Sequence, residues 1–205
     1  MKINKKKFIY LVSPNKITNN NFYDDLGKLF KSKKISFFQL RLKNTNMKRK
    51  IVIGKKVKKI CKKYDVKFLI NDDPILTKKL DADGCHLGQK DMNINKARQI
   101  LKNKIIGITC HNSIKLAKIA IVNNADYIAF GAFNDSKTKE IRYKAKINIL
   151  LSIKKITKIP VVAIGGINSK NYKKLLLNKA NFLAISGYIW NNKKYKPPEA
   201  IEKIK

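Results

Sequence analysis

The stretch KFLINDDPILTKKLDADGCHLGQKD, Lys67 to Asp91, contains the pattern that decides the fold. It begins with a short apolar run, 67–71, continues with a helix-period segment from Pro74, and ends with a second apolar run, 84–87. Short apolar runs of this kind are typical of buried strands, and two strands joined through a helix pair in parallel. The stretch therefore predicts one strand–helix–strand unit of a parallel sheet.

Two aspartates of this stretch follow its two strands. Asp72 comes directly after Asn71, and Asp91 ends the loop that leaves the second strand. Neighbouring strands lie about 4.8 Å apart, so the two carboxylates could reach one ion. Mg²⁺ suits such a pair, because it prefers oxygen ligands and usually takes one or two carboxylates together with substrate phosphates. The alternative is that both aspartates cap helices.

The same alternation of apolar runs and amphipathic segments occurs eight times along the chain. The expected strands are 8–12, 37–42, 67–71, 84–87, 105–109, 127–132, 161–164 and 182–185. The expected helices are 20–32, 46–64, 74–80, 94–101, 113–123, 147–157, 170–178 and 198–204. Eight such units can close a barrel. We predict one domain, residues 1–205, folded as a compact (β/α)₈ TIM barrel of the α/β class.

The chain is strongly basic, with 47 Lys and Arg against 13 Asp and Glu and a net charge of +34. Such a charge is typical of a nucleic-acid-binding protein, which is the alternative from a different class. However, only four of the basic residues are arginine, the residue that base readout favours. The lysines are spread over the whole chain with many Asn and Ile, which indicates a bias of composition. We expect no specific nucleic-acid partner, although the charge would steer small anions inward.

Several features indicate a cytoplasmic protein without a membrane partner. No apolar run approaches the roughly 18 residues of a membrane span. The apolar run 8–12 follows a basic start but is too short for a signal peptide. The cysteines, Cys61, Cys85 and Cys110, are expected to be buried and reduced. His86 and His111 are each isolated in the sequence, which favours a structural or hydrogen-bonding histidine over a zinc ligand.

In such a barrel the chemistry lies where the strands end, and a phosphate site is commonly built by the loops after strands seven and eight. Gly165 and Gly166 follow the seventh strand, and Ser186 follows the eighth. Glycine lets backbone N–H groups approach an anion without interference from a Cβ atom. These loops therefore predict a phosphate site, with ordinary tight turns as the alternative.

Polar residues also mark the ends of three other expected strands. Gln39, Arg41 and Lys43 alternate at the end of the second strand, and we expect the arginine to meet an anion at the rim, because an unpaired charge inside would be costly. The alternative is a solvated strand end. Thr109 brings a hydroxyl to the end of the fifth strand. The basic, hydroxyl-rich loop 131–139 follows the sixth, and we predict a lid that carries a phosphate-binding lysine.

In this order, the residues resemble the thiamine phosphate synthase family over almost the entire chain. The run Asp-Gly-Cys-His-Leu-Gly-Gln-Lys-Asp at 83–91 is the most distinctive. The other matching segments are QLRLK at 39–43, IND at 70–72, ADY at 125–127, SKTK at 136–139 and IPVVAIGGI at 159–167. The resemblance implies condensation of 4-amino-2-methyl-5-(diphosphooxymethyl)pyrimidine with the phosphate of hydroxyethyl-methylthiazole, with release of pyrophosphate.

The resemblance also implies a role for each matching residue. Pyrophosphate would be held by Arg41, Lys43, Asn71 and Lys139, and Mg²⁺ by Asp72 and Asp91. Gln39 would orient the pyrimidine ring, and Thr109 would hydrogen-bond near the leaving group. The thiazole substrate would contact Ser136 and Thr138, with its phosphate on backbone N–H groups near Gly165, Gly166, Ile185 and Ser186. Three residues depart from the usual pattern of the family. Thr109 occupies a position where serine is common, Ser136 one where threonine is common, and Asp73 one where arginine is frequent.

A related enzyme, the thiazole tautomerase, shares this barrel and is the nearest alternative. It has no pyrophosphate to hold, so the synthase is favoured by Arg41, Lys43, Asp72, Asp91 and Lys139. A tautomerase would need an acid–base residue near the ring, for which Cys110 or His111 are the candidates. The expected partners are the two small-molecule substrates, and the sequence leaves homo-oligomer formation open.

Overall fold

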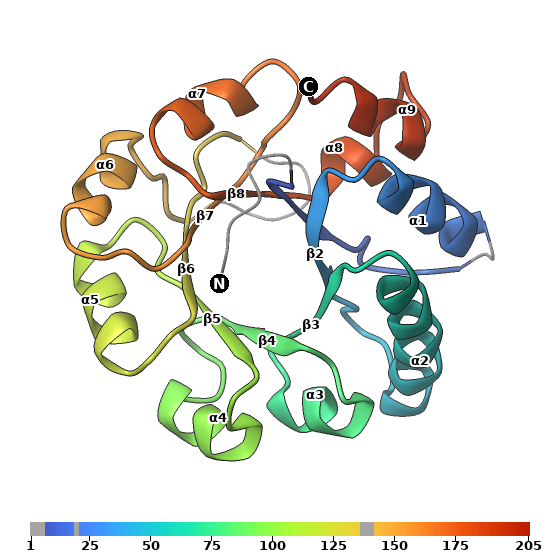
Figure 1. The fold of residues 1–205 in the computed structure, drawn as a ribbon, viewed down its shortest axis with the longest axis horizontal. Helices are drawn as coiled ribbons and strands as arrows, with labels where there is room; N and C mark the ends of the chain where they lie inside the picture. Colours follow the sequence, from blue (N-terminus) through green and yellow to red (C-terminus); the bar gives the residue numbers. More distant parts are fainter. Residues whose placement is uncertain (1–6, 19–20, 136–141) are drawn as a thin grey trace.

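The computed structural model describes residues 7–18, 21–135 and 142–205, and its strands form one closed parallel barrel (Figure 1). Each strand pairs with the next along the chain, and the last pairs with the first. The strands are β1 (Ile9–Val12), β2 (Ile35–Leu40), β3 (Lys67–Asn71), β4 (Gly84–Leu87), β5 (Ile105–Thr109), β6 (Tyr127–Phe130), β7 (Val161–Ile164) and β8 (Phe182–Ile185). The predicted fold class is confirmed.

The helices surround this ring of strands (Figure 1). They are α1 (Asn21–Lys31), α2 (Met47–Lys63), α3 (Pro74–Leu80), α4 (Ile94–Leu101), α5 (Ile114–Val122), α6 (Asn148–Lys154), α7 (Tyr172–Leu177), α8 (Gly187–Trp190) and α9 (Pro197–Glu202). The final helix packs beside the first, which completes the outer layer of helices. Within the ranges described, no helix combines the length and apolar character that crossing a membrane requires.

Two predicted strands were too long at their carboxyl ends. β2 ends at Leu40, because the N–H of Arg41 donates to the Ser13 hydroxyl at 2.9 Å and leaves the strand ladder. β6 ends at Phe130, and the next two residues bond to the loops around them. The sequence also missed α8, since a helix of four residues is too short to show a 3.6-residue period. Arg41 is therefore a loop residue.

Two apolar layers hold the barrel. The larger lies between the strands and the helices, and the smaller fills the inside of the barrel. The inner layer is built around four aromatic rings, Tyr10, Phe37, Tyr127 and Phe182, whose neighbouring centroids lie between 5.0 and 6.1 Å apart. The barrel is thus a packed core at this level, and the polar residues are left for its mouth.

The end of the barrel opposite the strands' carboxyl ends is closed by residues that precede the strands. Asp83 precedes β4 and accepts from the N–H of Phe68, and Asp126 precedes β6 and accepts from the N–H of Ile106, each at 2.8 Å. Arg98 forms an ion pair with Asp126 at 2.7 Å. These two aspartates of the matching segments therefore stabilise strand ends and lie away from the mouth.

Gly107 on β5 makes room for the Tyr127 ring. A Cβ atom at this position would lie 1.8 Å from Cζ of Tyr127. We expect Gly107→Ala to destabilise the protein by about 1–3 kcal/mol in urea unfolding, because an overpacked core must move side chains and backbone. Gly27→Ala on α1 is the control: its Cβ would come no closer than 3.8 Å to any atom, so it should stabilise or be neutral. Equal stability of Gly107→Ala and wild type would contradict this packing.

Candidate active site

The carboxyl ends of β2 and β3 bring two of the predicted side chains into contact. Gln39 lies on β2 and Asn71 ends the adjacent β3. The Gln39 amide Nε2 donates to Asn71 Oδ1 at 2.6 Å. Because the strands are parallel neighbours, both amides belong to the same mouth of the barrel. Gln39 is almost fully buried, so its orientation is determined by this bond and by the walls around it.

Asp72 and Asp91 meet at this mouth, as the first stretch predicted. Burial, the hydrogen bond to Asp91 and the charge of that carboxylate together raise the pKa of Asp72 to about 6. Lys43 and Asn71 oppose this shift. Asp91 Oδ2 also accepts from the N–H of Gly88 at 2.6 Å. Two carboxylates this close destabilise each other when both are ionised, so the pair favours a cation between them.

The chemistry of this pair fits Mg²⁺. Within the part of the chain that is described, no group of three or more His, Cys, Asp or Glu residues could surround a metal ion. A protein site for zinc would normally supply three or four such ligands. Mg²⁺ instead takes one or two carboxylates and completes its octahedron with water and substrate phosphates. Asp72 and Asp91 therefore suit a magnesium ion that arrives with a phosphorylated ligand.

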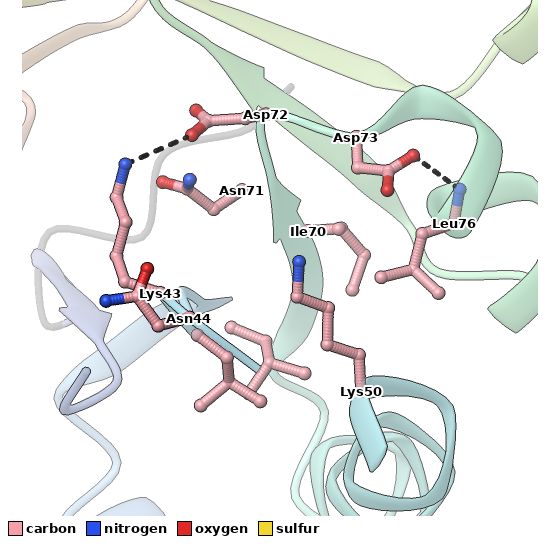
Figure 2. Close-up of a pocket in the computed structure, with 10 residues that line it drawn as sticks. Lys43, Asn44, Lys50, Ile70, Asn71, Asp72, Asp73 and Leu76 are labelled. Carbon is pink, nitrogen blue, oxygen red and sulfur yellow. Dashed lines mark hydrogen bonds and ion pairs between the residues drawn. The ribbon is translucent and has the colours of Figure 1, made fainter. Parts of the chain in front are cut away.

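A cavity of about 310 Å³ opens beside Asp72 (Figure 2). Lys43 Nζ lies 3.9 Å from Asp72 Oδ2 across it, and the amine of Lys50 points into it from α2. Asn44 and Asn71 supply further polar atoms at its edge. Two lysines and Asp72 thus line one opening.

Asp73 resolves the alternative that the aspartates cap helices. It is the N-cap of α3, and its Oδ1 accepts from the N–H of Leu76 at 2.8 Å (Figure 2). Asp72 makes no such bond: its backbone is left-handed, with φ of 64°, and its carboxylate faces Lys43. The capping role thus belongs to Asp73, whereas the Asp72 carboxylate is left to face Lys43. The unusual acidic residue after Asn71-Asp72 is explained by the helix that it starts.

Arg41 is held at the rim by a residue that the sequence did not indicate. Its Nη1 donates to Asn15 Oδ1 at 2.5 Å. Burial lowers the pKa of Arg41, and the charge of Asp72 opposes that shift. The guanidinium therefore lies in the field of Asp72. Asn15 was missed because one asparagine in a loop of an asparagine-rich chain carries no signal.

Thr109, at the end of β5, is joined to a hydrogen-bond chain that descends into the barrel. His86 Nε2 lies 2.8 Å from Thr109 Oγ1, and His86 Nδ1 lies 2.8 Å from the Tyr127 hydroxyl. The Tyr127 hydroxyl is in turn 2.8 Å from that of Tyr10. His86 therefore has the hydrogen-bonding role that was favoured for it. The two tyrosines were missed, because on buried strands they read as apolar residues.

The two glycines after β7 form a turn with free backbone donors. Gly165 and Gly166 have φ of 106° and 58°, and a Cβ on either would overlap neighbouring atoms of the β6 loop. The described residues provide no acceptor for the N–H groups of Gly165, Gly166 or Ser186. Ile185, which ends β8, is buried, and the Ser186 hydroxyl donates to Ser13 O at 3.2 Å. This geometry suits the predicted phosphate site.

Ser136, Thr138 and Lys139 lie outside the described residues. The segments on either side of them are joined: the N–H of Ala132 donates to Tyr143 O, and the N–H of Ala145 donates to Ala132 O, both at 2.9 Å. Lys144 and Asp135 form an ion pair at 2.9 Å. The roles of the three residues therefore stay predictions.

The two residues named for a tautomerase, Cys110 and His111, lie in different environments. Cys110 is fully buried, and burial raises the pKa of its thiol to about 12. A thiol in this state is neutral and shielded from a ligand at neutral pH. His111 stacks on Tyr143 with ring centroids 4.2 Å apart. Burial therefore speaks against Cys110 as the acid–base residue that a tautomerase would need. All three cysteines are free and buried, as expected.

Comparison with known proteins decides the family. The sequence model of thiamine monophosphate synthase matches residues 9–189, nearly the whole barrel. The chain belongs to the thiamine monophosphate synthase family. The thiamine-phosphate synthase of Pelagibacter ubique is 71% identical over the full length of both chains. That of Fusobacterium nucleatum is 44% identical over 80% of this chain and 79% of its own.

Solved structures agree with this thiamine monophosphate synthase assignment. The thiamine phosphate pyrophosphorylase from Pyrococcus furiosus superposes with a TM-score of 0.85 at 28% identity, covering 98% of this chain and 94% of its own. A 3-hexulose-6-phosphate synthase, at 15% identity and a TM-score of 0.65, shares the fold alone. The high identity to the Pelagibacter enzyme and the family match show that this chain is a transferase with thiamine-phosphate synthase activity.

Proposed function

We propose that this thiamine-phosphate synthase works by losing pyrophosphate before the new bond forms. The bond between the pyrimidine methylene carbon and its diphosphate oxygen breaks, and pyrophosphate leaves with the electron pair. The electron-rich aminopyrimidine carries the resulting cation. The thiazole nitrogen then donates its lone pair to the methylene carbon and becomes the positively charged nitrogen of thiamine phosphate. Atoms and charges balance without a base or a covalent nucleophile.

The observation that carries this proposal is the acidic pair Asp72 and Asp91 beside the cations of the same mouth. A departing diphosphate carries several negative charges, and preorganised positive groups are the most effective way to stabilise such a leaving group. Lys43 lies 3.9 Å from Asp72, and Arg41 is held at the rim by Asn15. A cation bound between Asp72 and Asp91 would explain why two carboxylates lie in a site that otherwise gathers positive charge.

We propose that Asp72 and Asp91 hold Mg²⁺, which would neutralise pyrophosphate as it departs. Residues of the chain would bind the pyrophosphate and orient the pyrimidine ring. Arg41, Lys43, Asn71 and Lys139 would hold the pyrophosphate, and Thr109 would hydrogen-bond near the leaving oxygen. Gln39, whose amide is positioned by Asn71, would orient the pyrimidine ring. These roles come from the family resemblance, and the contacts at the mouth support those of the described residues.

We propose that the thiazole phosphate lies at the other side of the mouth. Its phosphate would rest on the N–H groups near Gly165, Gly166, Ile185 and Ser186. The left-handed turn at the two glycines supports this, because free backbone donors in such a turn form an anion-binding concavity. Ser136 and Thr138 would contact the same substrate. The partners are therefore the two small-molecule substrates, without a specific nucleic acid.

We also propose a cytoplasmic location. Three buried cysteines outside any disulfide support it, since thiols persist in reducing compartments.

Pyrophosphate release tests the proposed function. Purified protein supplied with both substrates and Mg²⁺ should release one pyrophosphate for each thiamine phosphate formed, and omitting either substrate should abolish the product. Chelating the metal should reduce the rate to background. Release no faster than background in the complete mixture would turn the assignment toward a thiazole tautomerase.

A nucleic-acid role predicts a different result. Binding to duplex DNA would have to remain tight near physiological salt and depend on sequence. We expect only weak association that ignores sequence and disappears as salt rises, because scattered lysines act through counterion release. Titration of labelled DNA at several salt concentrations measures how steeply the binding constant falls with salt. Tight, sequence-dependent binding at physiological salt would contradict the enzyme as the sole function.

A further inference from the structure

The inside of the barrel contains four polar groups in one line. The Tyr10 hydroxyl contacts that of Tyr127, Tyr127 contacts Nδ1 of His86, and Nε2 of His86 contacts Oγ1 of Thr109, each at 2.8 Å. Tyr10 and Tyr127 are at most 2% exposed, and His86 is 9% exposed. Thr109 is partly exposed at the mouth. The line thus joins the apolar interior to the site.

The number of protons available limits which group donates and which accepts in each of these hydrogen bonds. With a neutral imidazole, the four groups carry four protons, and three contacts use one proton each. One proton is left over, and it belongs to Thr109, Tyr127 or Tyr10. Burial raises the pKa of both tyrosines, so both hydroxyls keep their protons.

A leftover proton inside the barrel is unfavourable. Tyr10 is surrounded by Val12, Phe37 and Phe182 and has no other hydrogen-bond partner among the described residues. A buried hydroxyl proton without an acceptor loses the hydration that it had in the unfolded chain. A leftover proton on Thr109 faces the mouth, where water or a ligand can accept it. The arrangement in which every donor points toward the mouth is therefore favoured.

We propose that Tyr127 is a positioning residue that holds His86 as the Nε2–H tautomer, so that the Thr109 hydroxyl presents a proton donor to the substrate. In the opposite arrangement Thr109 would donate to His86 and show only lone pairs to the mouth. Lone pairs repel a diphosphate, whereas a donor stabilises it as negative charge develops. This inference rests on the proposed function, because the benefit of a donor follows from an anionic leaving group.

Two further contacts hold Tyr127 in its place. Its ring stacks on that of His86, with centroids 5.6 Å apart and planes 16° from parallel. The absence of a Cβ at Gly107 leaves room for the ring. A hydrogen-bond partner at one ring nitrogen, such as the Tyr127 hydroxyl at Nδ1, commonly fixes the tautomer of a histidine that acts through its other nitrogen.

Nitrogen NMR of the histidines tests the tautomer directly. The chain has two histidines, so protein labelled with ¹⁵N-histidine gives two imidazole spin systems, and His111→Gln leaves that of His86. We expect a protonated Nε2 and an unprotonated Nδ1 that accepts a hydrogen bond, in the metal-free enzyme without substrate. A protonated Nδ1, or an imidazole protonated on both nitrogens, would overturn the proposal.

Two phenylalanine variants test the role of each tyrosine. Tyr127→Phe should lower kcat about tenfold, a typical cost of losing an outer partner, with KM for the pyrimidine diphosphate within about twofold. It should also change the Nδ1 signal of His86, because the nitrogen loses its donor. Tyr10→Phe leaves Tyr127 with His86 as its acceptor, so the Nε2–H signature should persist and kcat should fall less than about threefold. Loss of that signature in Tyr10→Phe would contradict the stated direction.

The measurements separate this inference from the proposed function. If Tyr127→Phe does not fold, the wild-type spectrum still decides the tautomer, and Thr109→Ser against Thr109→Val replaces the kinetic comparison. Serine should retain most activity and valine should lose it, since only serine keeps the proton. A wild-type enzyme that releases no pyrophosphate would refute the proposed function while the spectrum remained readable. Pyrophosphate release with an Nδ1–H spectrum would refute this inference alone.

Discussion

Asp72→Asn should lower kcat/KM by about a hundredfold or more and weaken the dependence of the rate on Mg²⁺. Loss of one preorganised electrostatic contact typically costs that much. Asparagine has nearly the shape of aspartate and tolerates the left-handed backbone at this position, where φ is 64°. The loss should therefore come from charge and not from misfolding. Steady-state kinetics over a range of Mg²⁺ concentrations measure it.

Asp73→Asn is the matched control. It changes the neighbouring carboxylate in the same way, but Asp73 is the N-cap of α3, and asparagine caps helices about as well as aspartate. We expect activity and stability close to wild type. If Asp73→Asn lost as much activity as Asp72→Asn, the assignment of metal binding to Asp72 would fail.

The same Asp72→Asn variant should be more stable than wild type without a divalent cation. The pKa of Asp72 is raised from its ordinary 3.8 to about 6 in the folded protein, so the ionised carboxylate is disfavoured there. The free energy of unfolding of the wild type therefore has its full contribution from Asp72 below pH 3.8, and this contribution is lost as pH rises through about 6. Melting in EDTA should show the variant melting higher at pH 8, with a smaller gap at pH 4.5. A gap independent of pH would exclude this carboxylate as its cause.

Lys139→Ala should also slow turnover by about a hundredfold or more. The family resemblance places its amine on the pyrophosphate, where a single charge in a water-poor site stabilises the leaving group. The folded state should be unaffected, as judged by thermal melting. Pyrophosphate release under saturating substrates measures kcat, and wild-type-like turnover would remove Lys139 from the proposed site.

Lys144→Ala provides the control for Lys139. It removes the same charge from the same loop region, and its ion pair with Asp135 is largely exposed to solvent. Exposed pairs of this kind contribute little to stability. We therefore expect less than a threefold change in turnover, a small effect that only general charge steering could produce. A loss equal to that of Lys139→Ala would indicate that total charge matters and not a specific contact.

The strands were predictable because a buried strand appears in the sequence as a short apolar run. Where a strand ends at an ordinary turn, as at Asn71 and Leu87, the predicted and observed bounds agree. Where a side chain from elsewhere takes over the hydrogen bonding, as the Ser13 hydroxyl does for Arg41, the apolar pattern runs past the true end. Local hydropathy contains no information about a partner 28 residues away.

The candidate site divides in the same way. Asp72 and Asp91 were predictable as a pair, because each follows a strand and neighbouring parallel strands end together. Whether an aspartate caps the following helix depends on its backbone, and that distinction between Asp72 and Asp73 appeared only in the structure. Asn15 and Tyr10 were missed, since their partners lie far along the chain.

The sequence by itself determined the order of strands and helices, the family, and the residue types that follow each strand. These properties depend on short-range hydrophobic period and on local motifs, which the chain shows directly. Only the tertiary structure decided which of these residues touch. Closing the barrel pairs β1 with β8 and brings Tyr10 within 2.8 Å of Tyr127, 117 residues away. Such contacts depend on strand register and ring closure, which arise from packing of the whole chain at once.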